Sequence, residues 1–91
     1  MNARDKADLG ARLKRIAGQV AGIHRMVDED RSSLDVITQV SAIRAALGGV
    51  ANILLASHVE ERANEALASP SARERRELVS ELVRLVQKRD M

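Results

Sequence analysis

The sequence predicts an all-α protein that assembles with further copies of itself, and three observations support this class. The 91 residues include no aromatic side chain and a single Pro, whereas strong helix formers are abundant. Apolar residues recur at alternating steps of four and three, the spacing along one face of a helix. The longest such segment is nearly free of charge, and so small a chain offers little surface to cover it. We expect one domain, residues 1–91, with helices at about 8–28, 33–67 and 70–89.

The first helix is expected to begin with Asp8 as its N-cap, after a disordered polar arm over residues 1–7. Its apolar positions predict one continuous stripe facing the second helix: Leu9, Leu13, Ile16, Val20, Ile23 and Val27. Between Leu9 and Val27 the segment has no carboxylate but carries four cations: Arg12, Lys14, Arg15 and Arg25. Although the net charge is only +2, this concentration suits a polyanionic partner.

The second helix should start after Ser32, which together with Asp35 resembles a capping box. From Leu34 to Val59 it has only two ionised side chains, Asp35 and Arg44. At 1.5 Å per residue this stretch spans roughly 39 Å. Two shorter helices of the same chain do not easily cover so much apolar surface, so we expect a second copy to complete the core. Gly48 and Gly49 indicate either close approach of another backbone or a local kink.

The third helix is expected to follow Ser69 as its N-cap, with Pro70 at the first helical position. Its apolar positions form a broad face: Leu78, Val79, Leu82, Val83, Leu85 and Val86.

Several functional classes are excluded or disfavoured. The absence of cysteine excludes disulfides, thiolate metal ligands and redox-active thiols. The sequence has no secretion signal and no uninterrupted apolar run near the ~20 residues of a membrane span. Ser57 beside His58 offers no oriented base or oxyanion hole, so no enzyme is expected. We expect a cytoplasmic protein with no cofactor and no membrane partner.

The run RLKRIAGQVAGIHRMVDEDRSSLDVITQVSAIRAALGGV, from Arg12 to Val50, resembles the copper-sensitive operon repressor family. This family also includes nickel, formaldehyde and persulfide sensors. The resemblance implies a three-helix protomer, an antiparallel dimer with a four-helix-bundle core, and a dimer of dimers. It further implies repression through GC-rich operator DNA, without a helix-turn-helix, and release by an inducer.

Within this resemblance, five residues are candidates for contacts with double-stranded DNA: Arg12, Lys14, Arg15, Gln19 and Arg44. The spacing of Arg12, Arg15 and Gln19 predicts that they share a helix face away from the apolar stripe. Arginine suits phosphate contacts and glutamine suits base edges. The alternatives are an ordinary solvated basic face and, for Arg44, pairing with Asp35 or with a carboxylate of another chain.

Sensor members carry a cysteine near the start of the second helix and a His-x-x-x-Cys or His-x-x-x-His pair near its end. The corresponding residues here are Ser33, His58 and Arg62. Ser33 and His58 would lie about 37 Å apart on one helix, so only antiparallel pairing of two copies would bring such positions together. One imidazole beside a hydroxyl and a guanidinium provides too few ligands for copper(I) or nickel. We therefore expect a degenerate site without metal.

The permanent charge of Arg62 predicts that this pocket either binds an anionic small-molecule effector or is silent. Alternatively, Arg62 pairs with nearby Glu60, Glu61 or Glu65 on a solvated surface. The predicted function is a homodimeric or homotetrameric repressor that responds to a non-copper or unknown effector. The alternative is a helical interaction module that forms mixed oligomers with a sensing-competent paralogue.

Overall fold

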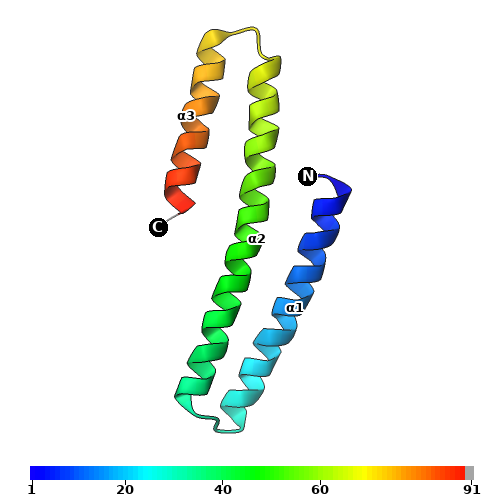
Figure 1. The fold of residues 1–91 in the computed structure, drawn as a ribbon, viewed down its shortest axis with the longest axis vertical. Helices are drawn as coiled ribbons and strands as arrows, with labels where there is room; N and C mark the ends of the chain where they lie inside the picture. The colour runs from blue at the N-terminus through cyan, green and yellow to red at the C-terminus, as the bar shows by residue number, and fades with distance from the viewer. Residues whose placement is uncertain (90–91) are drawn as a thin grey trace. The chain divides into compact units, whose positions relative to one another are not determined.

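Three α-helices make up the computed structural model, which describes residues 1–89: α1 (Ala3–Asp28), α2 (Ser33–Ala68) and α3 (Ala72–Arg89) (Figure 1). The predicted all-α class is confirmed, and residues 1–89 contain no strand. The last two residues of the predicted domain lie outside this description. The chain divides into two compact units, Met1–Leu54 and the residues from Leu55 onward, and α2 contributes to both.

Helix α1 begins at Ala3, five residues before the predicted start at Asp8, so most of the predicted disordered arm is helical. Asn2 is the N-cap, and its Oδ1 accepts a hydrogen bond from the Asp5 amide at 2.7 Å. The carboxylate of Asp5 also lies in the first turn, where it interacts favourably with the helix dipole. Asn and Asp are comparable N-caps, and the earlier of the two residues starts the helix.

The turn between α1 and α2 ends α1 through a left-handed residue. Asp30 has φ 54°, and its amide donates to the Val27 carbonyl at 3.2 Å. The Arg31 amide reaches back to the Met26 carbonyl at 3.0 Å. Together these bonds form a Schellman motif, with Asp30 in the position that usually holds glycine.

Helix α2 starts as predicted, because Ser32 Oγ accepts a hydrogen bond from the Asp35 amide at 3.2 Å. It remains continuous through Gly48 and Gly49 to Ala68. Helix α3 begins at Ala72 rather than at Pro70, which corrects the predicted cap. Ser71 Oγ accepts from the Glu74 amide at 3.2 Å, while Ser69 Oγ accepts from the Ser71 amide within the preceding turn.

In the first unit, α1 and α2 form an antiparallel hairpin (Figure 1). The buried core residues are spaced seven apart on both helices: Leu9 and Ile16 of α1, and Ile43 and Val50 of α2. Ile23, Ala46 and Ile53 pack against them. The hairpin therefore buries only one of the two rows that the alternating four-and-three spacing defines.

The other row remains exposed, which corrects the prediction of one continuous stripe between the two helices. We call it the open seam; it comprises Leu13, Val20 and Val27 of α1 with Val40, Leu47 and Leu54 of α2, each 41–56% exposed. A hairpin of two helices has one contact line, so it covers one row and leaves the neighbouring row uncovered.

Helix α2 is also long and apolar enough to cross a membrane, although its apolar residues are not contiguous. An 18-residue window reaches a mean hydropathy of 1.5, and 17% of it is buried within the chain. Length and composition are the only support for a membrane span, and the core helix of a soluble protein meets the same criterion.

Candidate functional site

Four of the five predicted DNA contacts lie exposed on the first unit. Lys14 and Arg15 of α1 and Arg44 of α2 have no carboxylate partner within residues 1–89. Asp35, the alternative partner for Arg44, pairs instead with Arg31 at 3.5 Å. These three cations are therefore available to a polyanion.

Arg12 is held more closely than its neighbours. Its Nε donates to Asp8 Oδ1 at 3.1 Å, one helical turn away, and both side chains are about half exposed. The far end of the side chain reaches α2, because a Cβ added to Gly49 would lie 3.1 Å from Arg12 Nη1. Arg12 thus extends toward the second helix, whereas the sequence predicted a position facing away from the apolar stripe.

Gln19 does not share the exposed face predicted for it with Arg12 and Arg15. Its side chain is half-buried, and its Oε1 is buried without a hydrogen-bond partner in the described part of the chain. Gln19 lies three residues after Ile16 and four before Ile23, which places it within the buried row of α1. That spacing was readable from the sequence.

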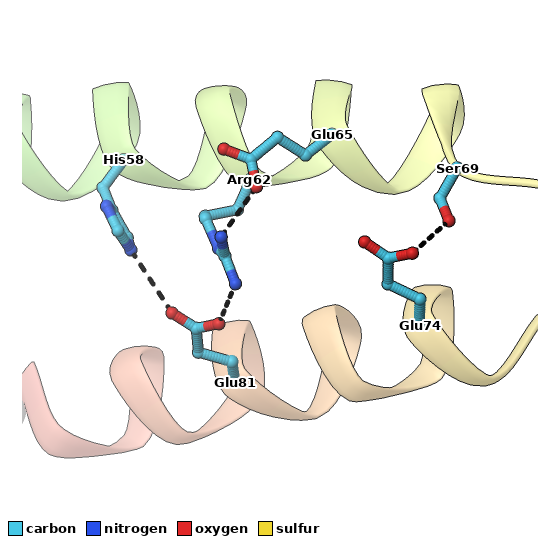
Figure 2. Close-up of polar contacts among 6 residues, drawn as sticks. All are labelled: His58, Arg62, Glu65, Ser69, Glu74 and Glu81. Carbon is cyan, nitrogen blue, oxygen red and sulfur yellow. Dashed lines mark hydrogen bonds and ion pairs between the residues drawn. The ribbon is translucent and has the colours of Figure 1, made fainter. Parts of the chain in front are cut away.

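The second unit brings two of the three predicted sensor positions together with a carboxylate from α3 (Figure 2). Arg62 donates to Glu65 at 2.7 Å and makes a short hydrogen bond to Glu81 Oε2. The other oxygen of Glu81 lies 3.8 Å from His58 Nε2, a distance suited to an ion pair when the imidazole is protonated. Glu81 thus lies between His58 and Arg62.

The electrostatic surroundings of Arg62 are acidic. A hydrogen bond to Glu81, together with the charges of Glu65 and Glu81, raises the pKa of the Arg62 guanidinium above its ordinary value. The hollow around it contains four carboxylates and two guanidinium groups, with one apolar residue: Glu65, Glu74, Glu77, Glu81, Arg62, Arg84 and Leu78. Negative charge exceeds positive charge in this hollow, which disfavours the binding of an anionic ligand.

Ser33, the third predicted sensor position, is the first residue of α2 and belongs to the other unit. It is exposed and lines a shallow hollow with residues of the α1–α2 turn, among them Asp30 and Arg31. Within residues 1–89, no three His, Cys, Asp or Glu side chains are grouped so as to hold a metal ion.

Glu81 is the member of this cluster that the sequence analysis missed. In an antiparallel hairpin, residues equally far from the turn face each other. Glu81 lies eleven residues after Pro70, and His58 lies twelve residues before it. Counting outward from the turn places Glu81 nearly opposite His58, and Arg62 lies one helical turn from His58.

The fold and the two sites define a small helical protein with exposed cations on one hairpin and a polar cluster on the other. The model of the metal-sensitive transcriptional repressors matches residues 5–88, and the chain belongs to this family. The family resemblance predicted from the sequence is thereby confirmed, and the family comprises transcriptional repressors, which bind DNA.

Two relatives illustrate the similarity. The chain is 43% identical over 65 residues to the copper-sensing transcriptional repressor RicR of Mycobacterium tuberculosis, covering 71% of this chain and 68% of the relative. It is 41% identical over 68 residues to the copper-sensing transcriptional repressor CsoR of Bacillus subtilis, covering 75% and 67%.

A solved structure has the same fold. It is a variant of the formaldehyde-responsive regulator FrmR from Salmonella enterica serovar Typhimurium, with a TM-score of 0.66, 24% sequence identity and 97% coverage of both chains. At that identity the likeness concerns the fold alone.

Proposed function

We propose that this chain is a cytoplasmic, homo-oligomeric repressor that binds a GC-rich DNA duplex through Arg12, Lys14, Arg15 and Arg44. The observation that carries this proposal is the lack of carboxylate partners for Lys14, Arg15 and Arg44 within residues 1–89. Cations without internal partners gain most from phosphate, because binding displaces condensed counterions from the DNA. Gln19 is assigned instead to the packing of α1 on α2, since its acceptor oxygen is buried.

The open seam supports assembly with a second copy. Its residues recur every seven positions on both helices, as in helices that pack along their whole length. Fully burying an aliphatic side chain contributes about 1.5–3 kcal/mol, so a second hairpin laid along the seam would gain substantially. Antiparallel pairing of two hairpins gives a four-helix core, and two such dimers would give a tetramer. The same pairing would bring Ser33 of one copy toward His58 and Arg62 of the other.

We further infer that the former sensor site does not take copper. The guanidinium of Arg62 already supplies a cation beside His58, and two carboxylates neutralise it. Copper(I) prefers thiolate and thioether ligands, and this cluster offers neither; the His58 imidazole is its one nitrogen ligand suited to the ion. The excess of carboxylates also disfavours the predicted anionic effector, so of the two predicted outcomes a silent pocket is the better supported.

The DNA contact is tested by salt dependence. Replacing Arg15 by Ala should weaken duplex binding and flatten the slope of log K against log salt by about 0.9, the value for one phosphate contact. Arg73→Ala is the control, because Arg73 is an exposed arginine that already pairs with Glu77 at 3.2 Å. An Arg15→Ala slope equal to that of the wild type would remove Arg15 from the interface.

A second function is favoured by one property of the open seam. All six of its residues are aliphatic, and none is the kind of polar residue that specifies one partner and register. The seam would therefore accept a paralogue with a similar seam, making the chain an interaction module in mixed oligomers. Co-expression with a paralogue followed by native mass spectrometry distinguishes the two, since mixed assemblies form only in the second case.

A further inference from the structure

The two consecutive glycines of α2 have different surroundings. A Cβ added to Gly48 meets nothing within 4 Å, whereas a Cβ added to Gly49 lies 3.1 Å from Nη1 of Arg12. A glycine within a helix lowers the stability of the helix by about 1 kcal/mol relative to alanine. Among the described glycines of the first unit, Gly49 is the only one at which an added Cβ would lie as close as 3.1 Å to another residue's atom.

The Arg12 side chain extends from α1 to Gly49 of α2. Its Nη1 lies against Gly49 of α2, and its Nε donates to Asp8 Oδ1 at 3.1 Å. The guanidinium thus has one hydrogen bond on α1 and a close neighbour on α2, while the side chain stays 44% exposed.

We propose that Gly49 is a positioning residue for the DNA contact made by Arg12. Because glycine has no side chain, the Arg12 guanidinium lies directly against α2 at position 49. In this position it presents its remaining N–H groups to phosphate in one orientation. Ordering a flexible side chain at an interface opposes binding, and a side chain ordered beforehand avoids that loss. This inference rests on the proposed function, because it assumes that the chain binds duplex DNA and that Arg12 takes part.

Alanine at position 49 would shift the end of the Arg12 side chain by a few tenths of an ångström without damaging the helix. A separation of 3.1 Å is too short for ordinary contact between a methyl group and a nitrogen, and the nitrogen is the end of a flexible side chain. The side chain therefore moves and the helix backbone stays. Alanine also has the higher helix propensity, so Gly48→Ala and Gly49→Ala should both preserve or raise the Tm.

The test is a double-mutant cycle on duplex affinity, measured by fluorescence anisotropy at fixed salt, with Gly48→Ala as the matched control. Gly49→Ala should weaken binding about two- to tenfold, the range expected when one side chain must be ordered on binding, while Gly48→Ala leaves it unchanged. Arg12→Ala should weaken binding as well. In the Arg12→Ala background, Gly49→Ala should have no further effect.

Three results overturn the inference: equal affinities for Gly49→Ala and Gly48→Ala, tighter binding by Gly49→Ala, or an undiminished effect of Gly49→Ala in the Arg12→Ala background. The last result would mean that position 49 acts through assembly or helix stability. Failure of the proposed function is a separate outcome, because the wild type would then bind no duplex at all.

Discussion

Arg62 of α2 and Glu81 of α3 share a short hydrogen-bonded ion pair that joins the two helices of the second unit (Figure 2). The same carboxylate turns its other oxygen toward His58, 3.8 Å away. Because a guanidinium stays protonated in proteins, this cluster carries a permanent cation between His58 and Glu65.

Loss of the Arg62 charge should loosen α3 from α2. We expect Arg62→Met to lower the Tm, because it leaves Glu81 without its closest cation. The loss should be smaller than that of Leu78→Ala, which empties a position only 6% exposed and removes a core leucine worth about 2–5 kcal/mol. Arg73→Met, at an exposed pair within α3, is the control and should leave the Tm unchanged. Equal Tm values for Arg62→Met and Arg73→Met would contradict this role.

The Arg62 contact should not respond to pH near neutrality. The hydrogen bond to Glu81 and the charges of Glu65 and Glu81 raise the pKa of Arg62 above its ordinary value, which already lies far above neutrality. A group with a raised pKa contributes its full stability below the unfolded pKa and loses it only as the pH rises through the folded one. The difference in Tm between the wild type and Arg62→Met should therefore stay constant from pH 7 to pH 10. A difference that shrinks over this interval would show that another group controls the contact.

The turn after α1 offers a stabilising substitution. Asp30 has φ 54°, a left-handed conformation that strains residues other than glycine. Asp30→Gly should raise the free energy of unfolding by about 1 kcal/mol, measured by urea denaturation. The matched control is Asp28→Gly in the last turn of α1, where glycine should lower stability by a similar amount. A loss of stability in Asp30→Gly would contradict the Schellman arrangement in solution.

The open seam should govern assembly. Leu47 of α2 is 45% exposed within one chain, and Leu47→Glu would place a carboxylate in the proposed four-helix core. We expect this variant to sediment as a smaller species than the wild type, with association weakened at least about tenfold. Leu67→Glu, at a leucine 83% exposed, should sediment like the wild type. If the wild-type protein requires detergent to stay in solution, this would indicate instead that α2 spans a membrane.

The helices could be predicted because their signals are local. The cap at Ser32 and the apolar spacing of α2 were read directly from the sequence, and the structure confirms both. The start of α1 was mistaken because Asn2 and Asp8 are similar caps, and spacing alone does not choose between them. Pro70 was similarly placed inside α3, whereas Ser71 supplies the hydrogen bond that starts the helix.

The candidate sites were harder to predict because they depend on which row of each helix is buried. Leu13 and Leu9 belong to rows with the same spacing, yet the hairpin buries only the row of Leu9. The same ambiguity concealed the burial of Gln19. Glu81 was missed for another reason, because its position opposite Arg62 depends on the turn that joins α2 and α3.

The central claim is that this chain is a repressor that binds DNA and does not sense copper. Its most direct test is an anisotropy titration of one duplex with and without copper(I). The duplex should be a fragment that the purified protein selects from the host genome. We predict saturable binding with the same Kd in both conditions, and no copper retained against a competing chelator of micromolar affinity. Weaker DNA binding in the presence of stoichiometric copper(I) would contradict the account.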